Sequence, residues 1–184
     1  MRLLKYCKNN MYLEPLCLFF LILAFTLDNP VNTLTGFYSI LKCPSILLTD
    51  YVYVGGIGAA FFNVAINLLF NILLLKILHV EINGPIFAGI MMIVGFSFFG
   101  KNVFNGLSIY LGIWIFSRIK KRPFRNYIIS VLFSGGLSPI VSYSIYGFGL
   151  PYYFSIPLGI MVGVIVGILI PSFAAHTISF HQGY

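Results

Sequence analysis

Charge is nearly absent from the carboxyl-terminal third of this chain. From Asn126 to Tyr184, fifty-nine consecutive residues include no Asp, Glu, Lys or Arg. This absence excludes a soluble domain, because the surface of such a domain carries charged side chains. Of the whole chain, 59% of residues are hydrophobic and 8% are charged. An apolar stretch of about 20 residues crosses the hydrocarbon core of a bilayer as a helix. The sequence therefore predicts an all-α polytopic membrane protein, with residues 1–184 forming one transmembrane domain in contact with lipid.

The motifs of enzymes and metal sites are also lacking. The chain has no Gly-x-Ser-x-Gly, no His-Glu-x-x-His and no phosphate-binding loop that ends in Lys-Ser/Thr. Its three cysteines show no C-x-x-C spacing, which disfavours a metal centre or a disulfide framework. We therefore expect no catalytic residue, no metal and no cofactor, and an intramembrane enzyme is the least favoured class.

Charged residues and Pro/Gly pairs divide the chain into six apolar segments. The first four are Tyr12–Asn29, Tyr51–Leu75 with an extension to Leu78, Ile82–Gly100 and Val103–Ser117. The last two share the uncharged stretch and turn near 147–151. The fourth has fifteen residues, about 22 Å of helix, so the junction before it is expected to dip below the membrane surface. The moderately apolar stretch 31–49 is interpreted as interfacial or re-entrant.

The basic residues predict an orientation. With six alternating helices and a cytoplasmic amino terminus, nine of the eleven Lys and Arg residues lie in inner segments and only Lys42 and Lys101 lie outside. Cytoplasmic loops are enriched in Lys and Arg, so both termini are predicted to be cytoplasmic, in a multi-pass protein of the cell membrane. Because the basic residues sit at helix ends, the net charge of +7 does not indicate a nucleic-acid partner.

Two rows of residues spaced four apart predict helix contacts. The first row comprises Gly55, Ala59, Asn63, Asn67 and Asn71, and the second comprises Gly159, Gly163 and Gly167. In lipid, helices associate through small residues that let their backbones approach closely, and through polar contacts. Gly55, Ala59 and the three glycines of the second row are therefore expected to lie in helix interfaces.

Polar groups inside the apolar segments form the candidate site. They are the row Asn63, Asn67 and Asn71, the junction residues Lys101, Asn102 and Asn105, the residues Ser134 and Ser138, and Asp50 as a candidate partner for Lys101. The stretch 134–139, which ends at Pro139, is expected to interrupt the fifth helix. Ionisable and polar residues in a membrane are costly, and transporters place them with broken helices near the midplane. The competing interpretation is interhelical hydrogen bonding without a solute path.

These features favour a transporter or channel for a small polar solute or ion. The alternatives are a non-catalytic membrane scaffold or accessory subunit, and an uncharacterised membrane protein fragment. A scaffold needs no hydrated path, and its polar residues would point at neighbouring helices.

An even number of helices also means that a second copy would enter the membrane in the same orientation, so we expect a homo-oligomer or a pairing with another copy of this unit.

Four strings in the chain resemble a known family. They are SILLTDYVYVGGIGAAFFN, INGPIFAG, GFSFFGKNVFN and IPSFAAHTISFHQGY, which lie between Ser45 and Tyr184. They resemble the uncharacterised bacterial membrane family catalogued as domain of unknown function 1576. The resemblance implies a bacterial cytoplasmic-membrane protein whose relatives often carry this unit twice. It implies no activity, so no functional residue follows from it.

Overall fold

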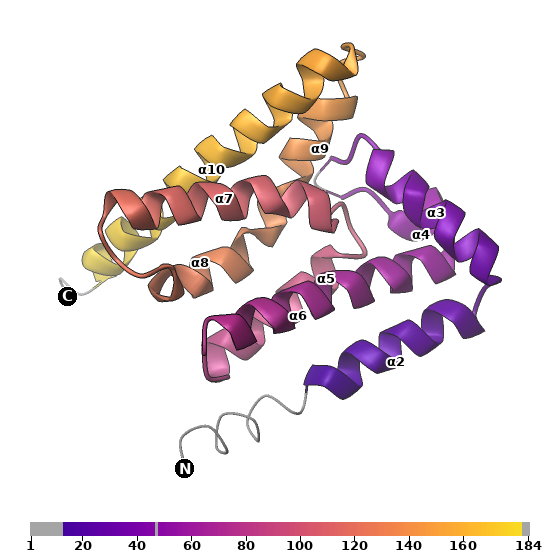
Figure 1. Ribbon diagram of the computed structural model, residues 1–184, viewed down its shortest axis with the longest axis horizontal. Helices are drawn as coiled ribbons and strands as arrows, with labels where there is room; N and C mark the ends of the chain where they lie inside the picture. Colours follow the sequence, from indigo (N-terminus) through magenta and orange to yellow (C-terminus); the bar gives the residue numbers. More distant parts are fainter. Residues whose placement is uncertain (1–12, 47, 182–184) are drawn as a thin grey trace.

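The protein is helical throughout the part that the structure describes. The computed structural model describes residues 13–46 and 48–181, with side chains up to Phe173 (Figure 1). The basic residues Arg2, Lys5 and Lys8 lie outside the described residues. The elements are α2 (Leu13–Thr26), α3 (Pro30–Lys42), α4 (Tyr51–Gly55), α5 (Ile57–Ile77), α6 (Gly84–Phe96), α7 (Val103–Ile119), η1 (Phe124–Tyr127), α8 (Ile128–Phe133), η2 (Ser134–Leu137), α9 (Ser138–Tyr146) and α10 (Tyr152–His181).

Three stretches among the described residues are long and apolar enough to cross a membrane by themselves. They are Ile57–Ile77, Phe124–Tyr146 and Tyr152–Phe173. The pair α2 and α3 meets the same criterion together, although the two helices are bent by 112° at their junction. The helices α6 and α7 are apolar but shorter than a span. The architecture is therefore that of an apolar helical membrane protein with three or four candidate spans.

The second apolar segment is not one helix, and the prediction of a continuous helix from Tyr51 was wrong. The segment divides at Gly56, whose φ of 87° lies in a region that favours glycine. Asp50 caps the short helix α4 by accepting hydrogen bonds from the backbone N–H groups of Val52 and Tyr53. The break turns α4 away from α5 and lets both helices pack against α3, where the Gly36 and Gly55 backbones touch.

The helices α6 and α7 run in opposite directions and are joined by residues 97–102, which reach the middle of a neighbouring span. We call this unit the α6–α7 hairpin and residues 97–102 its tip, although α6 packs mainly on α8 and α7 mainly on α10. In Figure 1, α6 begins and α7 ends on the same side of the molecule. Between them, a Cβ on Gly100 would lie 2.8 Å from the ring of Pro139, near the centre of the Phe124–Tyr146 stretch. The tip also pairs with the segment before α4, because the Tyr51 backbone N–H donates to the Phe98 carbonyl.

The Phe124–Tyr146 stretch is interrupted where the sequence predicts it. Residues 134–137 form the 3-10 turn η2, which separates α8 from α9. Pro139 lies in the first turn of α9, where its missing N–H removes no helical hydrogen bond. This interruption faces the tip of the α6–α7 hairpin, so two irregular backbone segments meet in the centre of the molecule.

The glycines of α10 lie in its contacts with α7 and α9. A side chain at Gly159 would meet Ile145 and the backbone of Val141, and one at Gly167 would meet the backbones of Ile109 and Gly112. Gly163 faces Ser108 in the same way. The outer face of α10 is largely exposed, as expected for a helix surface that contacts lipid.

Candidate functional site

Lys101 occupies the centre of the molecule. The residue is only 1% exposed, although it lies in the hairpin tip and not within a helix. The ammonium lies 5.2 Å from the centre of the Tyr110 ring on α7. Among the described residues no acidic side chain forms an ion pair with it. Lys101 is thus a buried cation. Among the described residues, the contact that stabilises its charge is the one with the Tyr110 ring.

Two glycines leave the space that the lysine side chain fills. A Cβ on Gly106 would lie 2.7 Å from Lys101 Nζ, and a Cβ on Gly135 would lie 3.1 Å from Lys101 Cδ. Gly106 belongs to α7 and Gly135 to η2. Larger residues at these positions would push the lysine out of its place between α7 and the interruption of the neighbouring span.

Ser138 lies beside the ammonium and has no partner. A Cβ on Gly106 would lie 2.7 Å from Lys101 Nζ and 3.7 Å from Ser138 Oγ, so the two groups face the same glycine. The hydroxyl is fully buried and forms no hydrogen bond among the described residues. By contrast, Ser134 donates to the Val131 carbonyl of its own turn. The site therefore holds one cation and one unpaired hydroxyl close together, away from water.

The asparagine row of α5 stabilises the hairpin tip. Asn63 Nδ2 donates to the carbonyls of Ser97 and Lys101, at 2.7 and 2.8 Å. Asn71 Oδ1 accepts from the Tyr110 hydroxyl at 3.0 Å. Asn67 donates only to Asn63, within the helix. Two of the three side chains thus connect α5 to the elements that surround Lys101, and the third supports Asn63.

Asn102 and Asn105 begin α7 with a reciprocal cap. Each side-chain oxygen accepts the backbone N–H of the other residue at 3.0 Å. Asn105 Nδ2 also donates to the Gly100 carbonyl and to Ser142 Oγ on α9. These bonds satisfy backbone groups that the hairpin tip leaves free, and they position the residue that precedes the cap, which is Lys101.

Asp50 does not join this site. Its carboxylate is exposed and caps α4, and no ion pair connects it to Lys101 in the described part of the chain. Its backbone nevertheless forms a bridge with Phe99 in the hairpin tip. Sequence proximity to an apolar helix suggested a buried charge pair, but helix capping determines where this carboxylate points.

One cavity leads toward the site. It has a volume of about 360 Å³ and is lined by residues of α9 and of the segment before α4, including Ser45, Ile46 and Pro139. Ile46 and Pro139 also provide the atoms nearest to the point where a Cβ on Gly100 would lie. Ile46 and Pro139 therefore lie between the cavity and Gly100, and the residues Asn67, Lys101 and Ser138 do not line it.

Three residues that shape the site were not predicted from the sequence. Tyr110 offers its ring to Lys101 and its hydroxyl to Asn71, while Gly106 and Gly135 provide the space. A tyrosine in an apolar segment, nine residues after a lysine, is a weak pattern by itself. The two glycines could not be found from spacing, because they face the lysine from different elements.

Comparison with protein families identifies the chain. A model of the family described as "Protein of unknown function (DUF1576)" matches residues 29–184. The chain belongs to this family. The comparisons with curated proteins and with solved structures found no match. In this member of DUF1576, the matched region contains the interrupted span, the hairpin tip and the whole asparagine row.

We predict that Asn63→Leu lowers the free energy of unfolding of the purified protein by about 1–3 kcal/mol. The substitution leaves the carbonyls of Ser97 and Lys101 without a donor in a buried place, and such groups are costly. Asn67→Leu is the matched control and should cost less, because its described bonds go only to Asn63. Thermal unfolding in detergent compares the two. Equal losses would contradict the assignment of Asn63 as the residue that stabilises the tip.

Proposed function

We propose that the protein is a transporter or channel for a small polar solute or ion, with Lys101 in the path. The observation that carries the proposal is a fully buried lysine without an acidic partner among the described residues. On insertion scales a lysine at the centre of a membrane helix costs about 2.5–3.5 kcal/mol. A contact with an aromatic ring contributes about 0.5–2 kcal/mol. The lysine is thus costly to the fold, and a transport role accounts for its presence.

The chemistry of the site favours an anionic solute. Lys101 supplies a cation, and the unpaired Ser138 hydroxyl beside it can donate a hydrogen bond. The amino-terminal end of α7 begins one residue after the lysine, and the helix dipole favours negative charge there. Paired irregular segments at mid-membrane depth are typical of the solute sites of transporters.

The cavity beside Pro139 supports an access route. It is lined by the residues that lie nearest to Gly100, which is next to Lys101 in the chain. A small movement of the hairpin tip relative to α9 would join this cavity to the buried lysine. In the described conformation the site is closed on this side, which corresponds to an occluded state of an alternating-access cycle.

We further propose a topology for a protein of the bacterial cytoplasmic membrane. Of the six helical segments, α6 and α7 form a pair that enters from the cytoplasmic side, turns at Lys101 and returns. Both termini are then cytoplasmic, as are the basic residues from Lys76 and from the 118–125 segment, in agreement with the positive-inside rule. In this topology Lys101 is not in an outer loop. Lys42 is then the one basic residue assigned to the outer side, so the difference in Lys and Arg number between the two sides becomes larger.

Cys43 tests the side assignment. A membrane-impermeant maleimide should label Cys43 in intact cells when the other two cysteines are replaced. Partial burial raises the pKa of this thiol, so labelling should be faster at mildly alkaline pH because the thiolate is the reactive form. A variant that retains only Cys7, which lies outside the described residues, should react only after lysis. The reverse pattern would contradict the orientation.

A membrane scaffold is the second candidate function. It is favoured by the asparagine row, because Asn63 and Asn71 make contacts that hold elements together. It does not account for the unpaired Ser138 hydroxyl or for the isolated Lys101 cation, since a scaffold gains stability when both are replaced by apolar residues. The effect of those replacements on solute flux therefore separates the two candidates.

We predict that Lys101→Met and Ser138→Ala lower flux in proteoliposomes by about tenfold or more, a change of about 1.4 kcal/mol in the barrier. The assay measures uptake of inorganic anions, carboxylates, small neutral polar solutes and cations at matched amounts of folded protein. Both replacements should leave stability unchanged or raised, because each removes a costly buried polar group. Loss of flux can then be separated from loss of folding.

Lys42→Met is the matched control, since Lys42 is an exposed lysine that contacts the Tyr38 ring. It should transport like the wild type. A wild-type protein that moves none of these solutes would favour the scaffold. Variants of Lys101 and Ser138 that transport normally would remove both residues from the path.

A further inference from the structure

A second polar feature lies far from Lys101, at the turn between α7 and η1. Five of the eight residues from Arg118 to Arg125 are basic, and none is acidic. All five basic side chains are exposed. In the part of the chain that the structure describes, none of them forms an ion pair. The turn therefore presents a concentrated positive charge without an internal counter-charge.

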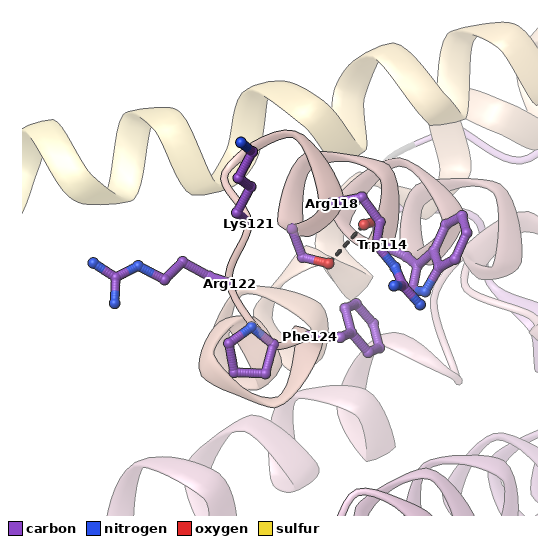
Figure 2. Close-up of a pocket in the computed structure, with 7 residues that line it drawn as sticks. Trp114, Arg118, Lys121, Arg122 and Phe124 are labelled. Atoms are coloured by element: carbon purple, nitrogen blue, oxygen red, sulfur yellow. Dashed lines mark hydrogen bonds between the residues drawn. The ribbon is translucent and has the colours of Figure 1, made fainter.

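A cavity of about 580 Å³ opens at this turn (Figure 2). Its basic lining residues are Arg118, Lys121 and Arg122, and its aromatic ones are Trp114 and Phe124. The Arg118 guanidinium lies 4.9 Å from the centre of the Trp114 ring. Figure 2 shows Trp114 and Phe124 on the same side of the turn, with Lys121 and Arg122 extending from its other side. The cavity is thus amphipathic, with aromatic walls and a cationic rim.

The backbone at Lys121 adds an independent observation. Lys121 has a φ of 52° and follows directly after the cap residue of α7. Glycine is the usual residue at this left-handed position of a helix end, and a residue with a Cβ is strained there. A lysine in place of the less strained glycine puts a cation at the rim of the cavity.

We propose that this cavity binds the phosphate headgroup of an anionic phospholipid. The rim cations would contact the phosphate, and the exposed faces of Trp114 and Phe124 would contact the glycerol and the first part of the acyl chains. Tryptophan is enriched at the level of lipid headgroups, and basic pockets between membrane helices bind anionic headgroups. The volume is within the range of ligand pockets, about 300–1,000 Å³.

The positive-inside rule accounts for basic residues in this turn, but not for their arrangement. Orientation depends on the number of Lys and Arg residues in a short loop. It requires neither a cavity with aromatic walls nor a lysine in a left-handed conformation. The lipid site does not depend on the transport proposal either, because the two sites share no residue.

Trp114 is the only tryptophan of the chain, so its fluorescence reports on this cavity alone. The full-length protein is placed in nanodiscs that contain either brominated phosphatidylglycerol or brominated phosphatidylcholine at equal mole fractions. Bromine atoms in the acyl chains quench tryptophan on contact. We expect the anionic lipid to be preferred over the zwitterionic one by more than about tenfold, since each basic residue near an anionic lipid contributes about fivefold.

Lys121→Gly and Arg118→Gln should each lower this preference by about fivefold. Lys121→Gly is the sharper variant, because glycine suits the left-handed position and the thermal stability of the turn should not fall. Arg125→Gln is the control, since it removes the same charge from a residue that does not line the cavity. Inorganic phosphate should not displace the lipid when compared with chloride at matched ionic strength.

Three results would overturn the proposal. Equal quenching of the wild type by the two lipids would show that no anionic lipid is selected. An equal loss of preference in Arg125→Gln and Lys121→Gly would show a diffuse charge effect of the whole turn. Displacement of the lipid by inorganic phosphate would assign the cavity to a free anion.

Discussion

Irregular backbone inside an apolar environment is tolerated only when its polar groups find partners within the protein, because no water is present to replace them. This constraint governs the centre of the molecule. The tip of the α6–α7 hairpin leaves carbonyls free at Ser97, Gly100 and Lys101, and the carboxamides of Asn63 and Asn105 donate to all three. The asparagines therefore determine where the chain can turn inside the bundle, and the position of Lys101 follows from that turn.

The hydrogen-bonded backbone of the hairpin tip contrasts with the buried side chains of Lys101 and Ser138. The bonds made by Asn63 and Asn105 are those of a well-packed membrane protein, and packing alone explains them. Lys101 and Ser138 lie only a few ångströms away and have no comparable partners among the described residues. Stability favours the removal of such groups, so the contrast between the hydrogen-bonded backbone of the tip and an unpaired cation with its neighbouring hydroxyl is the physical basis for the proposed transport function. Asn102 Nδ2, next to the lysine in the chain, is also buried without a partner among the described residues.

The sequence predicted the helical class, the family, the helix interruption at 134–139 and a fourth helix too short to span by itself. These features follow from local patterns, such as charge-free runs, a proline in an apolar segment and a segment too short to span. It failed at Gly56, because a glycine in an apolar run has the same pattern whether it packs inside a helix or ends one. It also paired Asp50 with Lys101, and missed Gly106, Gly135 and Tyr110, since contacts between distant elements leave no trace in spacing.

The depth of the hairpin tip in the bilayer tests the central claim most directly. A spin label on Phe99→Cys, with the native cysteines replaced, reports that depth through its accessibility to oxygen and to a water-soluble nickel complex. A label on Tyr153→Cys at the start of α10 is the reference, since both side chains are exposed. The nine residues of α9 lie between the depth of the tip and the depth of the α10 start, so we expect the Phe99 label to lie about 13 Å deeper. Two labels at the same headgroup depth would contradict it.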